Sequence, residues 1–354
     1  MATWLALQRF SAQFFPLPPT LNSNHRPPEG FVAMDVHPGL RMPTDLRRCS
    51  WCGEAEKPSQ KMKKCAACEY VIYCSKLCQR SAWDDHKPSC QYMSKATKNM
   101  DPLFEMEVRP FGFANSLAFS RALNDWMEAH LWALQTCTQA YILKLGGVKF
   151  CKIPPIYMMN FDVVCRTTPR QTPVERNPAL TFSLRAQGVI DIADWNASNP
   201  ANAEYWRGTD PEREQVVAFM EQRCGSAFAC VMCAVFKCDR VSMSNTLNFP
   251  ILHVRKRLPL DEASLDILED VLLLCCGTIN KGFPLRCLES GTSKIPLPGR
   301  FVRKGGKWVW EPLFADWDEY SPTSKEYEGL HATLSGNRKT QLSPKQLFSA
   351  LLAL

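Results

Sequence analysis

Apolar residues recur at helical spacing over one long stretch of the chain, residues 115–145. A spacing of three or four residues places them on one face and predicts a long amphipathic helix that ends at Gly146 and Gly147. The apolar face comprises Leu117, Phe119, Leu123, Trp126, Met127, His130, Leu131, Leu134, Cys137 and Tyr141. Because His130 falls on this face, we interpret it as a core histidine and not as a ligand or base.

After residue 148 the pattern changes to short runs rich in β-branched and aromatic residues, which is typical of strands. The expected strands are 156–165, 180–190, 227–236 and 249–255, and two helices, about 211–223 and 261–282, interrupt them. Residues 301–310 predict a hairpin that turns at Gly305 and Gly306, with Arg303 facing Trp308. A capping box from Ser343 to Gln346 starts a final helix. Residues 148–354 are therefore expected to form an α+β globular region of unknown function.

The segment before residue 49 differs from the rest in composition. Prolines are frequent between residues 16 and 48, so we expect 1–48 to be a flexible, proline-rich lead-in. No stretch reaches the roughly 18 apolar residues of a membrane span. With no secretory signal in view, we expect reduced thiols and an intracellular protein, in the cytoplasm or the nucleus.

Seven cysteines and one histidine lie between residues 49 and 90 in four closely spaced pairs. The pairs are Cys49 and Cys52, Cys65 and Cys68, Cys74 and Cys78, and His86 and Cys90. Gaps of two or three residues let two side chains converge on one tetrahedral Zn²⁺, so eight ligands fill two closed sites. No coordination position is left for water, which makes both zinc ions structural. Spacing alone leaves open whether the pairs are used in order or interleaved.

The residues around the last two pairs carry a family resemblance. The stretch from Tyr73 to Gln79, followed by Trp83, His86, Lys87 and Cys90, resembles a MYND-type zinc finger over residues 49–90. That resemblance implies interleaving, with Cys49, Cys52, Cys74 and Cys78 on one ion and Cys65, Cys68, His86 and Cys90 on the other. A helix bearing Trp126 and His130 soon after a single finger is similar to a group of fungal MYND-type proteins. We therefore expect an α+β protein: a small irregular double-zinc finger (49–90), a connector and helix (91–147), and a mixed α/β C-terminal region.

The charge of the chain bears on its partners. The formal charge is +7. Within residues 49–90 the formal charge of +2 becomes about −1 once seven thiolates and two Zn²⁺ ions are counted. A duplex-binding module needs a basic face. DNA reading by the finger is therefore not favoured.

The resemblance implies that the finger mediates protein–protein interaction, in related fingers with short proline-containing peptides. The positions that match the peptide groove are Gln79 and Trp83, and the alternative for Trp83 is a small local core over the zinc. We expect a regulatory adaptor that binds partner proteins or proline-rich peptides through the finger.

Two other functions fit parts of the sequence. A nucleic-acid-binding transcriptional regulator would use Trp308, Trp310 and two basic groups, Arg255-Lys256-Arg257 and Lys61, Lys63 and Lys64. An enzyme would be a SET-type protein-lysine methyltransferase relative, or would use His253 or His331 in residues 148–354. The only Asn-His pair is Asn24-His25, and no phosphate loop or nucleophile elbow is visible, so we expect no enzyme activity.

A second cysteine group comprises Cys224, Cys230, Cys233 and Cys238. Cys230 and Cys233 have a two-residue gap, but the apolar residues around them indicate a buried strand. Residues three apart on a strand point to opposite faces. We expect core thiols here and no metal.

Overall fold

The structure of the chain is a computed structural model. It describes residues 49–52, 54, 56–57, 60–68, 71–84, 86–87, 90–91, 94, 102–147, 156–172, 175–198, 202–203, 206–207, 210–253, 259–288, 295–336 and 338–354. The expected flexible segment 1–48 and the basic run at 255–257 lie outside the described residues.

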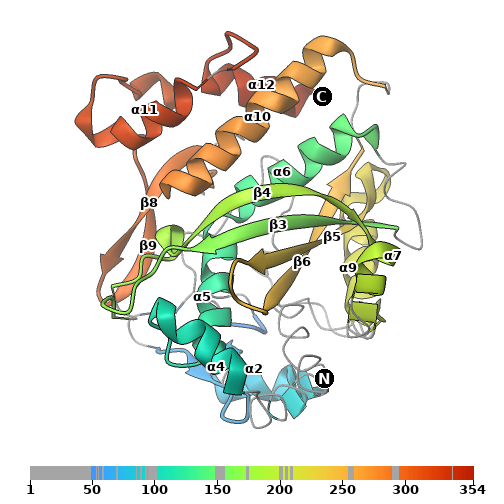
Figure 1. Cartoon of the computed structure of the whole chain (residues 1–354), viewed down its shortest axis with the longest axis vertical. Coiled ribbons are helices and arrows are strands. Elements are labelled where there is room, and N and C mark those ends of the chain that lie inside the picture. The colour runs from blue at the N-terminus through green and yellow to red at the C-terminus, as the bar shows by residue number, and fades with distance from the viewer. Residues whose placement is uncertain are drawn as a thin grey trace.

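A four-stranded sheet in the order β4-β3-β5-β6 forms the centre of the molecule (Figure 1). Its strands are β3 (Tyr157–Cys165), β4 (Phe182–Asp191), β5 (Phe228–Cys238) and β6 (Ser244–Leu252). β3 runs antiparallel to β4 and parallel to β5, and β5 runs antiparallel to β6. Helices α7 (Ile192–Ser198) and α9 (Asp210–Cys224) lie in the connection from β4 to β5. The expected α+β class is confirmed.

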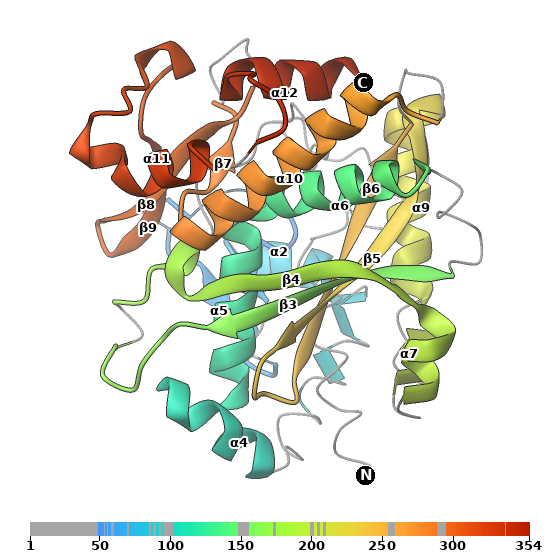
Figure 2. The ribbon, with the colours of Figure 1, turned by 45° about the horizontal axis from the view of Figure 1, so that its top comes forward.

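The prediction of one continuous helix over residues 115–145 is wrong. The structure has α5 (Ser116–Ala129) and α6 (Leu131–Lys144), and the chain leaves helical geometry at His130, where φ is −101° and ψ is 14°. The two helices run in different directions (Figure 2). Every residue from Leu131 to Ala140 is buried, so α6 is a core helix and has no single apolar face to continue.

Polar side chains of α6 cover the free edge of the sheet. Gln135 Nε2 donates to the carbonyl of Pro250 at 2.6 Å. Gln139 both donates to the Leu252 carbonyl, at 2.9 Å, and accepts from the Leu252 amide, at 3.0 Å. An edge strand otherwise presents unpaired backbone groups to another chain. These side-chain contacts satisfy part of the outer edge of β6 within the fold.

Strand β6 begins five residues earlier than expected, at Ser244 and not at 249. The polar residues at its start do not match the apolar pattern from which strands are predicted. They are nevertheless buried, and Asn245 Nδ2 donates a hydrogen bond to Asn124 Oδ1 of α5 at 2.7 Å. A buried amide that is hydrogen-bonded avoids most of the cost of its burial. The amide contact between strand and helix therefore takes the place of apolar packing.

Helix α10 (Glu262–Lys281) lies beside α6 and anchors the C-terminal part of the chain (Figure 2). Its expected ends are confirmed, since Asp261 caps the first turn and Gly282, at φ 71°, closes the last. Asp270 is fully buried and accepts from the backbone amides of Lys339 and Thr340, both at 2.8 Å. This carboxylate fixes the loop that leads into the last helix.

The C-terminal hairpin has the expected register. A three-stranded sheet contains β7 (Leu285–Arg286), β8 (Leu297–Lys304) and β9 (Lys307–Pro312). Arg303 faces Trp308, with its guanidinium 5.6 Å from the ring centroid, and the glycines at the turn have positive φ. Such a turn matches the twist of the flanking strands.

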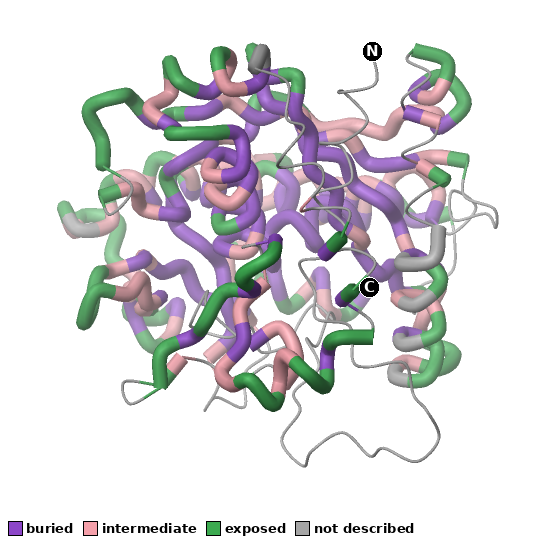
Figure 3. The backbone as a smooth tube through the Cα atoms, turned by 90° about the horizontal axis from the view of Figure 1, so that it is seen from below, coloured by how far each residue is buried: buried purple, intermediate pink, exposed green. Residues whose placement is uncertain are grey.

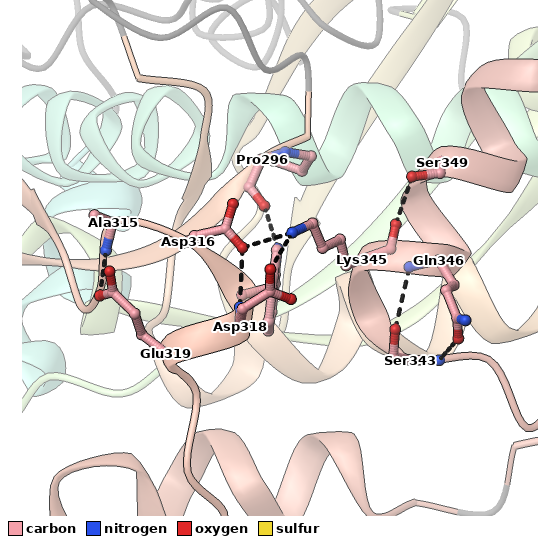
Figure 4. Close-up of polar contacts among 10 residues, drawn as sticks. Pro296, Ala315, Asp316, Asp318, Glu319, Ser343, Lys345, Gln346 and Ser349 are labelled. Carbon is pink, nitrogen blue, oxygen red and sulfur yellow. Dashed lines mark hydrogen bonds and ion pairs between the residues drawn. The ribbon is translucent and has the colours of Figure 1, made fainter.

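The last helix, α12 (Pro344–Ala353), follows α11 (Glu328–Leu334) and begins with the expected capping box of Ser343 and Gln346. Lys345 lies between Asp316 and Asp318, at 2.7 and 2.6 Å (Figure 4). Hydrogen bonding to Lys345 lowers the pKa of Asp316. These exposed ion pairs contribute little to stability, and Leu347, Phe348 and Leu351 dock the helix by burial.

Buried segments gather in the middle of the molecule and exposed ones at its surface (Figure 3). One apolar cluster runs from the finger residues Cys65 and Tyr73 through α5 and α6 to Phe348 of α12. Within it Phe161 and Phe236 stack at 4.9 Å between ring centroids. Among the described residues, no helix combines the length and the apolarity that crossing a membrane requires.

His130 is a core histidine, as expected. It is fully buried, and its Nε2 lies 3.0 Å from the Ala179 carbonyl, so Nε2–H donates and Nδ1 is left without a proton or a partner. Burial lowers its pKa from 6.5 to about 4. The folded chain therefore holds His130 neutral where the unfolded chain protonates it.

We predict that His130 makes the fold less stable as the pH falls from about 6.5 towards 4, because only the unfolded state takes up the proton in that range. Between pH 7 and pH 5, wild type should lose about 2 kcal/mol more unfolding free energy than His130→Gln. Urea unfolding at both pH values measures this difference. Equal losses in the two proteins would show that the residue titrates normally in the fold.

Candidate metal centre

The described residues of the finger comprise two very short strands, one short helix and a further helical stretch, seen at 83–84, 86–87 and 90–91, that carries His86 and Cys90. β1 (Lys63–Lys64) pairs antiparallel with β2 (Ile72–Tyr73), and α2 (Lys76–Ser81) follows. Cys65 directly follows β1, Cys74 directly follows β2, and Cys78 lies on α2. Ser75 caps α2, since its Oγ accepts from the Cys78 amide at 3.1 Å. Together these elements bring ligands from distant points of the segment to one place.

The eight expected ligands meet in two groups. Cys49, Cys52, Cys74 and Cys78 form one group, and Cys65, Cys68, His86 and Cys90 form the other, with the ligand atoms of each group within 4.8 Å of one another. The pairs are thus interleaved, as the family resemblance implied. We call the first group the all-cysteine cluster and the second the histidine-containing cluster.

Distances within the clusters test whether zinc fits. Zn–S bonds of about 2.3 Å in a tetrahedral site place two sulfurs about 3.8 Å apart. Cys74 Sγ lies 3.6 Å from Cys52 Sγ and 3.4 Å from Cys78 Sγ, and Cys65 Sγ lies 3.7 Å from Cys90 Sγ. Cys68 Sγ lies 3.6 Å from His86 Nε2. Both donor sets fit one structural zinc ion each, with no position left for a substrate.

Burial makes some of these donors depend on a cation. It raises the pKa of Cys74 to about 11 and that of Cys90 to about 12, so these two thiols alone would keep their protons at neutral pH. Burial acts in the same direction on Cys49 and Cys65, but hydrogen bonds outweigh it and lower the pKa of both. Burial lowers the pKa of His86, which keeps its ring neutral and able to donate a lone pair. Bound Zn²⁺ supplies the positive charge that stabilises the thiolates.

The residues expected to bind a peptide lie beside the metal. Gln79, on α2, is half-buried, and Trp83 is 38% exposed. The Trp83 ring packs edge-on to the His86 ring, with 6.1 Å between centroids. Leu77 on α2 is 72% exposed. Leu77 was not among the expected residues because it falls between two zinc ligands, Cys74 and Cys78. A large apolar residue on so short a helix could nevertheless have indicated an exposed contact position.

Other candidate residues are not brought together. His253 is exposed, and His331 Nδ1 contacts the Tyr320 hydroxyl at 3.2 Å. Trp310 is buried and donates to the Pro284 carbonyl at 3.1 Å, so it packs in the sheet and offers no ring for base stacking. Lys61, Lys63 and Lys64 are exposed.

The second cysteine group forms no metal cluster among the described residues. Cys230 and Cys233 belong to apolar clusters on opposite faces of the sheet, as expected for positions three apart on a strand. Cys230 is disulfide-bonded, so the expectation of core thiols is wrong for that residue. Cys224, Cys233 and Cys238 remain thiols.

We predict that Cys74→Ser lowers the bound zinc from two equivalents to one or fewer, because it removes a ligand that lies close to two others in the all-cysteine cluster. Cys224→Ser, which changes a half-buried thiol outside both clusters, is the matched control and should keep two. Elemental analysis of the purified, dialysed chains measures the content. Two equivalents in Cys74→Ser would remove Cys74 from the ligand set.

Comparison with known proteins supports the assignment of residues 49–90 as a zinc-binding segment. A family model, the MYND finger, matches residues 49–90. The chain is similar to the SET domain and MYND-type zinc finger protein 6 of Schizosaccharomyces pombe, 40% identical over 125 residues, which covers 30% of this chain and 25% of the relative. It is also similar to the histone-lysine N-methyltransferase ASHR1 of Arabidopsis thaliana, 32% identical over 84 residues, covering 23% and 17%.

A third relative is the SET domain-containing protein 14 of Caenorhabditis elegans, 40% identical over 42 residues, covering 12% of this chain and 10% of the relative. The matches to these three relatives thus span a quarter or less of their lengths. No solved structure matches the chain.

These names correct one expectation. The conclusion that the chain is not an enzyme is contradicted, because relatives are named as SET-domain proteins and one as a histone-lysine methyltransferase. That conclusion rested on the lack of short catalytic motifs, and active sites assembled from distant residues leave no such motif. What the clusters and the family model establish together is that residues 49–90 of this chain are a MYND-type zinc finger with sites for two zinc ions.

Proposed function

We propose that the finger is a docking surface that holds a short proline-containing segment of a partner protein. The observation that carries the proposal is the exposure of Leu77 and Trp83 beside half-buried Gln79, all within seven residues of chain. Large apolar side chains exposed together on a small module are typical of interaction sites. The two zinc sites give this surface a fixed shape.

Rigidity of the surface comes from the metal. Helix α2 has six residues, far fewer than an isolated helix needs to be stable in water. Its position is set at Ser75 by the cap and at Cys78 by the all-cysteine cluster. The position of the Trp83 ring is set by its contact with the ring of His86, a ligand of the histidine-containing cluster. Both zinc ions therefore fix the surface before a partner arrives, which lowers the entropy cost of binding.

A proline-containing peptide suits these side chains. Proline segments are already extended and keep their backbone carbonyls free. Gln79 carries an amide that can donate to such a carbonyl, and Leu77 and Trp83 offer apolar walls for proline rings. Because the filled finger has a net charge near −1, the peptide need not be acidic or strongly basic.

We predict that Trp83→Ala and Gln79→Ala each weaken binding of proline-rich peptides, Trp83→Ala by about tenfold or more, because an aromatic wall is a common hot spot. Met106→Ala, on α4 (Pro102–Val108), is the matched control, since Met106 is 64% exposed. Titration calorimetry and zinc analysis of each variant separate lost contacts from lost folding. Unchanged affinity in both finger variants with full zinc content would refute the groove.

A second candidate function is methyl transfer to protein lysine. It is favoured by the relatives' names and by the extent of the likeness, since the match to the S. pombe protein covers 30% of this chain whereas the finger model covers only residues 49–90. The likeness therefore reaches beyond the finger. In this candidate the finger would recruit a protein on which another part of the chain acts.

We predict, if this candidate holds, that the full chain transfers labelled methyl groups from S-adenosylmethionine to lysines of histones. Mass spectrometry locates the modified lysines, and heat-denatured chain is the control. Absence of both methyl transfer and S-adenosylmethionine binding by the folded, zinc-loaded chain would rule the candidate out and leave docking alone.

A further inference from the structure

The two metal clusters differ sharply in their exposure to solvent. In the histidine-containing cluster Cys65, Cys68 and Cys90 are each 2% exposed and His86 is 7% exposed. In the all-cysteine cluster only Cys49 is fully buried, whereas Cys52, Cys74 and Cys78 are half-buried. Three cysteines of one cluster are thus partly accessible to solvent-borne reagents, whereas the ligands of the other are almost completely covered.

The neighbours of each cluster account for this difference. The His86 ring lies between the rings of Tyr73 and Trp83, with 6.1 Å between centroids on each side, and Tyr73 is itself buried. The all-cysteine cluster instead has exposed residues beside its ligands in the chain, Glu54 after Cys52 and Lys76 and Arg80 on α2. Susceptibility of a cysteine thiolate to oxidation increases with its exposure.

We infer that the all-cysteine cluster is a modification site for hydroperoxides and that the histidine-containing cluster is protected from them. Cys74 is the central sulfur, 3.6 Å from that of Cys52 and 3.4 Å from that of Cys78. No sulfur has to travel far to form a disulfide with Cys74. Exposure limits the first reaction to Cys52, Cys74 and Cys78, and the central position of Cys74 selects it among these three.

The chemistry balances with hydrogen peroxide as the oxidant. The Cys74 thiolate attacks one peroxide oxygen, the O–O bond breaks, and the departing hydroxide takes a proton and leaves as water, which gives a sulfenic acid. The thiolate of Cys52 or Cys78 then attacks the Cys74 sulfur, the S–O bond breaks, and a second proton converts the departing hydroxide to water. Two thiolates have supplied two electrons and formed one disulfide. The cluster has lost two ligands and can no longer hold its zinc.

Oxidation would also act on the proposed docking surface, and this consequence alone rests on the proposed function. Cys78 fixes α2, which carries Leu77 and Gln79. When the all-cysteine cluster loses its zinc, α2 loses this anchor, and a helix of six residues is not stable alone. Peroxide would therefore switch peptide binding off while the histidine-containing cluster stays intact.

The test uses the full chain loaded with two zinc ions, treated with hydrogen peroxide under anaerobic conditions. A chelating dye follows released zinc, and differential alkylation with mass spectrometry maps the oxidised cysteines. The first equivalent of zinc should leave about tenfold faster than the second or more, with Cys74 in a disulfide to Cys52 or Cys78. A thiol reductant with added zinc should return the zinc content to two equivalents.

Cys276→Ser, which removes a half-buried thiol on α10, controls for oxidation elsewhere and should release zinc at the wild-type rate. Loss of both ions at one rate, first oxidation at Cys65, Cys68 or Cys90, or no release at all would each overturn the inference. Peptide binding is measured separately. If zinc leaves as described while no proline-rich peptide ever binds, the oxidation site stands and the proposed docking function fails.

Discussion

Crossed metal ligation is the constraint on which the finger depends. A segment of about 40 residues cannot bury enough apolar surface to offset the entropy of its chain. Zinc sites contribute on the order of 10 kcal/mol each in finger peptides. Because Cys49 and Cys52 share a cluster with Cys74 and Cys78, one zinc ion joins the first and third ligand pairs along the chain. The second pair, Cys65 and Cys68, lies between them in the sequence and belongs to the other cluster. Neither half of the finger can therefore hold its shape alone.

The finger is joined to the rest of the molecule by both apolar and polar contacts. Its buried residues continue into the same apolar cluster as α5 and α6. Lys307, at the start of β9, donates to the Glu56 carbonyl at 2.7 Å. The finger lies at the end of the molecule opposite α11 and α12 (Figure 1). The proposed docking surface and the helical C-terminal end thus lie on separate parts of one fold.

Local patterns predicted most elements because their signals lie within a few residues. The cap at Asp261, the stop at Gly282 and the glycine turn at 305–306 each fix their own backbone. The break at His130 was not predictable, because it follows from burial of α6 on nearly all sides, which depends on distant partners. The early start of β6 was hidden because Asn245 pairs with Asn124, 121 positions away. Spacing identified the zinc ligands, but only the fold and the family resemblance show how they are shared.

The eight ligands divide into one set of four sulfurs and one set of three sulfurs and a nitrogen. Cadmium NMR of the cadmium-substituted chain tests this most directly, because the shift of each ion reports how many sulfurs bind it. We expect two signals of equal intensity, one typical of four sulfurs and one typical of three sulfurs and one nitrogen, the latter coupled to the His86 ring. A single signal, or two signals without a nitrogen ligand, would contradict it.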